Sequence, residues 1–137
     1  MALETADQIL QMADQLTASA DAIHRRLLTA IKNKEISAAD ADQTLQDETI
    51  LRKRADAMFI DAAVHVVNGL ALAQQELVDT INKGNEKLKD IKKVNAFLDF
   101  VADMLALAAA IYSAKPKTIL AAFKEVKADI DAFGKLA

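Results

Sequence analysis

The fold is decided by two apolar stretches, AMFIDAAVHVVNGLALA at residues 57–73 and VNAFLDFVADMLALAAAIYSA at residues 94–114. Both would be hydrophobic almost all the way around a helix, and helices of that kind lie at the centre of a bundle or in lipid. A turn at Lys83-Gly84-Asn85 would place the two stretches side by side, because their midpoints are nearly equidistant from Gly84. The sequence therefore predicts a central apolar helical hairpin.

The composition restricts the rest of the chain to helix. The 137 residues include three glycines and one proline, too few for a sheet protein, in which turns recur every ~8–12 residues. The absence of cysteine excludes disulfides and thiolate chemistry. A chain of this length fits one domain, residues 1–137.

An elongated antiparallel four-helix bundle is the predicted architecture of this all-α chain. The helices are expected at residues 3–32, 38–82, 86–112 and from 116 onward. Ser37 precedes the second helix as a capping residue, and Pro116 suits the first position of the fourth. The long second helix is predicted to continue through Gly69, because the apolar face keeps its register across that glycine.

The unequal lengths of these helices predict a protein partner. A helix over residues 38–82 would be longer than either neighbour, which would leave apolar stripes uncovered within the chain. A homodimer or a dedicated protein partner is therefore expected. The residues predicted to form this interface are Ile9, Leu16, Ile23, Leu45 and Leu51.

Polar residues interrupt the two apolar stretches at helical spacing. They form two stripes, Asp61, His65 and Asn68 in the first stretch and Asn95, Asp99 and Asp103 in the second. Reflection about the predicted turn would place His65 level with Asp103. The stripes are either solvated edges of buried helices or a buried His–Asp and Asn–Asp network, and the second arrangement requires a partner for every group.

No pattern in the chain indicates an enzyme. Metal sites in helical bundles of the di-iron type use Glu-x-x-His pairs, which this sequence lacks. It also lacks a glycine-rich phosphate loop and a nucleophile elbow. We therefore expect no catalytic residue, metal, cofactor or small-molecule substrate. The net charge of −3, and basic clusters without interleaved aromatic residues, predict no nucleic-acid binding.

A membrane function is the alternative prediction. Residues 94–114 could span a bilayer by length, but Asp99 and Asp103 would each cost about 2.5–3.5 kcal/mol. This cost excludes a constitutive span and leaves open a conditional insertion, with Lys115, Pro116 and Lys117 as a basic tip. In arrangement alone, residues 94–126 resemble the apolar hairpin of helical pore-forming toxins, which implies a membrane-active protein.

The predicted function is that of a non-enzymatic interaction or assembly module, of the inhibitor, immunity-protein or scaffold type. The alternative is a membrane-active, pore-forming helical protein that uses residues 94–126. The N-terminal residues show no cleavable signal pattern. A cytoplasmic location is therefore expected, and export without a cleavable signal stays open.

Overall fold

The computed structural model describes the backbone of residues 1–136 and the side chains of residues 1–133. In this part of the chain there are five α-helices, two short 3-10 turns and no strand. The helices are α1 (Ala6–Lys32), α2 (Ala38–Ile60), α3 (Gln74–Lys87), α4 (Val94–Tyr112) and α5 (Pro116–Leu136), with 3-10 turns at Ala62–His65 (η1) and Leu88–Asp90 (η2). The all-α prediction is confirmed.

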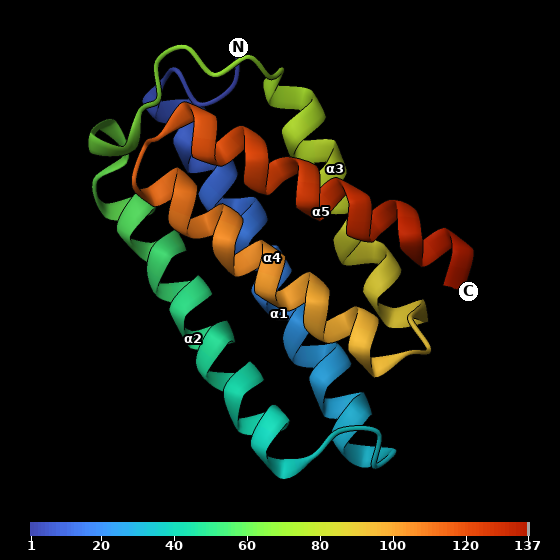
Figure 1. Cartoon of the computed structure of the whole chain (residues 1–137). Coiled ribbons are helices and arrows are strands. Elements are labelled where there is room, and N and C mark those ends of the chain that lie inside the picture. The colour runs from blue at the N-terminus through green and yellow to red at the C-terminus, as the bar shows by residue number, and fades with distance from the viewer. Residues whose placement is uncertain (137) are drawn as a thin grey trace.

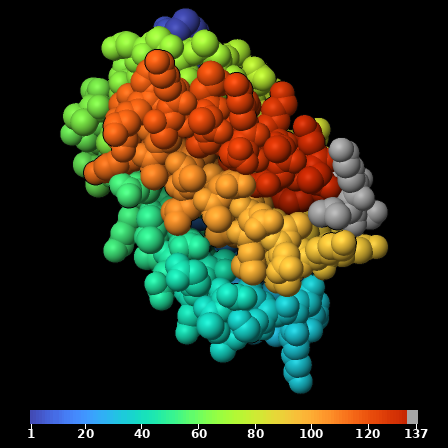
Figure 2. Space-filling view, in the orientation of Figure 1, coloured from blue at the N-terminus to red at the C-terminus, as the bar shows by residue number. Residues whose placement is uncertain are grey.

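The five helices form a closed ring around one core. The main helix contacts follow the order α1, α2, α4, α5, α3 and back to α1, with a smaller contact between α1 and α4. In Figure 1, α1 lies behind, with α2 and α3 on either side of it and with α4 and α5 in front. Figure 2 shows that α4 and α5 cover most of α1 on this face.

The helix directions differ from those of the predicted antiparallel bundle. α1 and α2 are antiparallel, as are α4 and α5 (Figure 1). α3 runs parallel to α1, because Gln74 hydrogen-bonds to the carbonyl oxygen of Gln8 while Asn85, further along α3, accepts a hydrogen bond from Ser19. The bundle thus combines two antiparallel hairpins with parallel neighbours.

Two helix starts follow from side-chain capping. Ser37 accepts a hydrogen bond from the backbone N–H of Asp40 at 3.1 Å, as predicted. α1 begins at Ala6 rather than at residue 3, because Thr5 and Gln8 form a reciprocal capping box. Capping satisfies backbone N–H groups that have no partner in the first turn of a helix.

The predicted long second helix is wrong. α2 ends at Ile60, and the chain passes through η1 and an extended crossover before α3 begins at Gln74. Gly69 lies in this crossover with a φ of +80°, a conformation that glycine adopts without steric cost. The apolar pattern continued across it because Val67, Leu70 and Leu72 are buried in the loop as well.

The crossover is fixed by the first residues of the chain. The N–H of Ala2 donates to the carbonyl oxygen of Leu72 and the N–H of Val67 donates to that of Leu3, both at 2.7 Å. The side chains of Ala2 and Leu3 are fully buried. We call this contact the N-terminal latch.

The predicted turn at residues 83–85 is also wrong, and with it the predicted hairpin. α3 passes through Gly84, and the chain reverses at residues 88–93 instead. A Cβ atom at Gly84 would lie 2.9 Å from Ile130 Cδ1 and 3.0 Å from the ring of Phe100. Gly84 therefore allows α4 and α5 to approach α3 closely. The apolar helical hairpin that the structure contains is α4–α5.

Candidate functional site

Most of the predicted interface residues belong to the core. Ile9, Leu16 and Ile23 have no exposed surface, and Leu51 is 2% exposed. Because α2 is shorter than predicted, α3 occupies the side of α1 that was expected to be open. Of these five positions, only Leu45 lies on the surface of the chain.

The two polar stripes do not face each other. His65 is buried and donates from Nδ1 to the carbonyl oxygen of Tyr112 at 2.9 Å, so it lies level with the end of α4 rather than with Asp103. Asp61, Asn68, Asn95 and Asp99 are exposed. The buried His–Asp network is therefore not formed, and these four residues lie on solvated edges.

Asp103 instead approaches a carboxylate on α5. Burial, a hydrogen bond with Asp103 and the nearby charges of Asp103, Asp99 and Glu125 raise the pKa of Asp129 to about 7. One oxygen of Asp129, Oδ2, is buried without a partner. Near neutral pH, the Asp129 carboxyl group therefore holds a proton part of the time, at the α4–α5 contact. We call this cluster the acidic seam.

The α1–α2 contact carries charges of opposite sign on its outer side. Arg52 pairs with Asp21 at 2.8 Å and with Glu48 at 2.9 Å, and Glu48 also contacts His24 Nδ1 at 2.8 Å. Glu48 is buried. These four residues form a continuous network, which we call the paired seam.

Large apolar side chains are exposed where α2 and α4 end. Ile60 is 86% exposed and Val64 is 66% exposed, while Phe59 and Tyr112 are about two-fifths exposed. The guanidinium of Arg54 lies 4.5 Å from the centre of the Tyr112 ring. We call Phe59, Ile60, Val64 and Tyr112 the apical patch. Sequence reasoning missed it because a continuous second helix would have buried this region.

The predicted basic tip lies at the same end of the molecule. Lys115 and Lys117 are exposed on either side of the half-buried Pro116, in the turn that joins α4 to α5. Figure 1 shows this turn beside the end of α2 and η1. The structure therefore brings the tip close to an exposed apolar surface, which the sequence did not predict.

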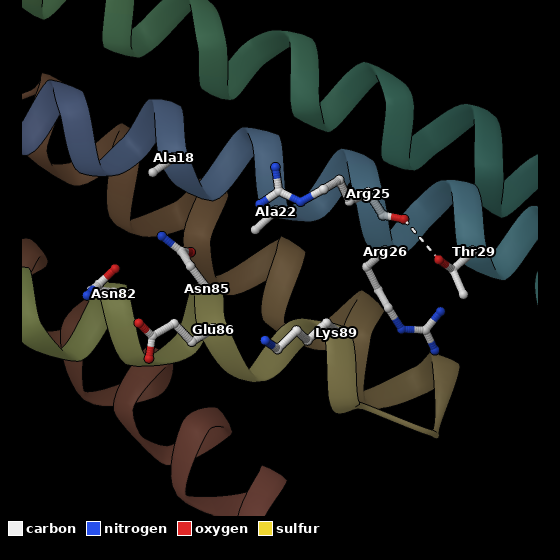
Figure 3. A pocket seen from close by; sticks show the side chains of 9 residues that line it. All are labelled: Ala18, Ala22, Arg25, Arg26, Thr29, Asn82, Asn85, Glu86 and Lys89. Carbon is white, nitrogen blue, oxygen red and sulfur yellow. Dashed lines mark hydrogen bonds between the residues drawn. The ribbon is translucent and has the colours of Figure 1, made fainter.

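Basic residues that are far apart in the sequence lie close together at the contact between α1 and α3. Arg25 and Arg26 on α1 and Lys89 on η2 line one groove, together with Asn82, Asn85 and Glu86 of α3 (Figure 3). The groove has a volume of about 460 Å³. The parallel packing of α1 and α3 creates it, so the antiparallel bundle predicted from the sequence could not reveal it.

Metal binding and membrane insertion make different demands on the structure. Among the side chains that the structure describes, no three His, Asp or Glu residues are grouped so as to hold a metal ion. α4 is the one helix within the described chain that is long and apolar enough to cross a membrane. Core helices also meet this criterion, and α4 buries Phe97, Phe100 and Met104 in the bundle.

Comparison with known proteins finds no matching protein family, curated protein or solved structure. The features of the molecule that bear on its function are therefore its own surfaces.

Proposed function

We propose that this protein is a non-enzymatic interaction module that associates with a second copy of itself through the apical patch. The observation that carries the proposal is the exposure of Ile60 and Val64, at 86% and 66%. Burying one such side chain contributes about 1.5–3 kcal/mol. A folded chain with a well-filled core does not require these residues to be apolar, but an interface does.

The side chains around the patch have the chemistry of an interface. Residues that dominate binding energy at protein interfaces are enriched in aromatic residues and arginine. Phe59, Tyr112 and Arg54 supply these types beside Ile60 and Val64. In a two-fold symmetric dimer, the apical patch of one copy would pack against the same patch of the other copy. An apolar surface is complementary to itself in such an arrangement.

Light scattering over a range of protein concentrations tests the proposal. We expect a concentration-dependent dimer that Ile60→Ser with Val64→Ser converts to a monomer. Leu28→Ser with Ile50→Ser is the matched control, because these residues are 52% and 40% exposed on other parts of α1 and α2. A wild-type protein that stays monomeric at all concentrations, or a dimer that the control pair disrupts equally, would contradict the proposal.

A second candidate function is binding to an anionic membrane through the same end of the molecule. It is favoured by the position of Lys115 and Lys117 beside the apical patch. Apolar and aromatic side chains flanked by lysines suit the interface of an anionic bilayer. In this function the α4–α5 hairpin would insert when the acidic seam is protonated.

Vesicle experiments at neutral and acidic pH distinguish the two functions. The membrane function predicts leakage from anionic vesicles that increases with acidification and that Lys115→Gln with Lys117→Gln reduces. Asp99→Asn with Asp103→Asn should shift the leakage towards neutral pH, because fewer charges would have to be neutralised. Absence of leakage at both pH values, in the wild type and in the aspartate variant, would remove this candidate.

A further inference from the structure

The groove between α1 and α3 is lined by small and polar side chains. Ala18 and Ala22 leave space on its α1 side, which also carries two arginines, while Asn82, Asn85 and Glu86 project from α3. Arg25 and Lys89 lie along its length in Figure 3. The volume of about 460 Å³ is within the range of small-molecule sites, ~300–1,000 Å³.

The wall at one end of this groove is fixed by Arg26. Its guanidinium donates to the carbonyl oxygen of Ile91 at 2.9 and 3.2 Å and pairs with Glu35 at 3.3 Å. It is 4% exposed and lies 5.5 Å from the centre of the Phe97 ring. Arg26 therefore holds the turn after α3 against α1, and its hydrogen bonds are made within the chain.

The two other cations of the groove, Arg25 and Lys89, have no charged partner within the described part of the chain. Both side chains are exposed. They come from different elements, α1 and η2. Two unpaired cations on a concave surface favour an anionic ligand, because the field of each is concentrated there.

The wall of the groove also contains an amide N–H group without a protein partner. Asn85 Oδ1 accepts a hydrogen bond from Ser19 Oγ at 2.7 Å, while its Nδ2 is buried without a protein partner. Buried N–H groups are nearly always paired with protein, water or ligand. Asn82 lies one turn earlier on the same face of α3 and also lines the groove.

The charges of the groove distinguish between anions. A phosphate monoester carries about −1.5 to −2 charges near neutral pH and would balance Arg25 and Lys89 together, whereas a carboxylate would balance only one of them. Glu86 adds a hydrogen-bond acceptor to the same groove. Glu86 would repel a bare polyanion but would accept a hydrogen bond from a ligand hydroxyl group.

We propose that this groove binds a small hydroxylated phosphate monoester, with the phosphate between Arg25 and Lys89 and a hydroxyl group on Glu86. An extended nucleic acid is disfavoured, because the adjoining cavity of about 530 Å³ carries Glu35 and Asp90 beside Lys92. Such a site was not expected from the sequence, in which residues 25 and 89 belong to separate clusters.

NMR titration at constant ionic strength tests this site, with glycerol 3-phosphate and inorganic phosphate as probes. We expect saturable shifts at Arg25, Lys89 and the side-chain amides of Asn82 and Asn85, and tighter binding of glycerol 3-phosphate. Arg25→Gln with Lys89→Gln should weaken binding about tenfold or more, because two charge-assisted hydrogen bonds are lost. Glu86→Ala, which removes both the charge and the acceptor, should strengthen binding of inorganic phosphate and abolish the preference for the hydroxylated probe.

The matched control is Lys53→Gln with Lys124→Gln, which removes the same charge from exposed positions outside the groove. It should leave both affinities unchanged. Equal weakening by the control pair would show attraction to net charge alone and would overturn the proposal. Absence of saturable shifts in the groove at millimolar probe, or shifts centred on another face, would also overturn it.

Discussion

The two antiparallel hairpins differ in the charges along their contacts. In the paired seam, Arg52 joins acidic residues of both α1 and α2 at distances below 3 Å. In the acidic seam, Asp103 of α4 lies close to Asp129 of α5, and among the described side chains neither carboxylate forms an ion pair. At neutral pH the first contact is stabilised by its charges and the second is destabilised by them.

Because the charges of the acidic seam oppose the contact, α4 and α5 must be held together by the apolar side chains that they bury in the core. Phe100 and Phe133 contact each other with their ring centres 5.6 Å apart, and Phe123, Val126 and Ile130 are buried along α5. Apolar burial is independent of pH, whereas repulsion between carboxylates is not. The two hairpins should therefore respond in opposite directions to changes in charge.

The largest expected effect on stability comes from the apolar packing of α4 and α5 against α3 at Gly84. Gly84→Val should lower the free energy of unfolding by about 2–3 kcal/mol, because the added carbons overpack against Phe100 and Ile130. Urea unfolding measures this change. Lys83→Val, on the exposed side of the same helix, is the control for the cost of β-branching. Equal losses in the two variants would show that α4 and α5 do not depend on close packing at Gly84.

Removal of the central cation should weaken the paired seam. Arg52→Gln is expected to lower the free energy of unfolding by about 1–2 kcal/mol, because the buried carboxylate of Glu48 loses a charged partner. Lys53→Gln is the control, since Lys53 is exposed on the next position of α2. The same urea experiment applies, and a loss no larger than that of the control would contradict a stabilising role for this network.

The corresponding change in the acidic seam should have the opposite sign. Asp129→Asn is expected to raise the free energy of unfolding at pH 7 by about 1 kcal/mol, a value reduced for the partial solvation of the site. Asp131→Asn removes the same charge from an exposed position of α5 and should have little effect. A destabilised Asp129→Asn protein would show that the carboxylate contributes favourably.

The stabilisation by Asp129→Asn should depend on pH. The pKa of Asp129 is raised from 3.8 to about 7 on folding, so the folded wild type binds a proton more tightly than the unfolded chain. The protonated Asp129 side chain therefore contributes its full stability below the pKa of the unfolded chain, 3.8, and this stability is lost as the pH rises towards 7. The difference between variant and wild type should therefore be small at pH 4 and largest above pH 7. A difference that is constant with pH would contradict the raised pKa of Asp129.

The smallest effect is expected at Asp99, which is exposed and acts on Asp129 through its charge alone. Asp99→Asn should raise the free energy of unfolding by about 0.2–0.5 kcal/mol at low salt. The gain should disappear at high ionic strength, because exposed charges are screened. A gain that persists in high salt would indicate a direct contact.

The sequence predicted helices correctly where capping and periodicity agree. Ser37 and Pro116 mark the starts of α2 and α5, and α1 and α4 end at Lys32 and Tyr112 as expected. The local signals at these positions are side-chain caps and the fixed φ of proline, which act regardless of tertiary structure.

Two glycines show what the sequence could not predict. The sequence pattern predicts Gly69 within a helix and Gly84 in a turn, whereas Gly69 lies in a loop and Gly84 lies in a helix. A glycine is selected either by backbone conformation or by close approach of a neighbour, and only the fold distinguishes the two. The groove and the apical patch were missed for the same reason, since both depend on where α3 begins.

The N-terminal latch has a consequence for the order in which the chain can fold. It joins residues 2 and 3 to residues 67 and 72, and contacts between segments so distant in the chain form late, because the loop that they close is entropically costly. During synthesis, the buried site of Leu3 cannot be completed before the crossover has left the ribosome. Any packing of α1 on α2 that precedes this point therefore lacks the crossover at one end, and the latch can close that end only afterwards.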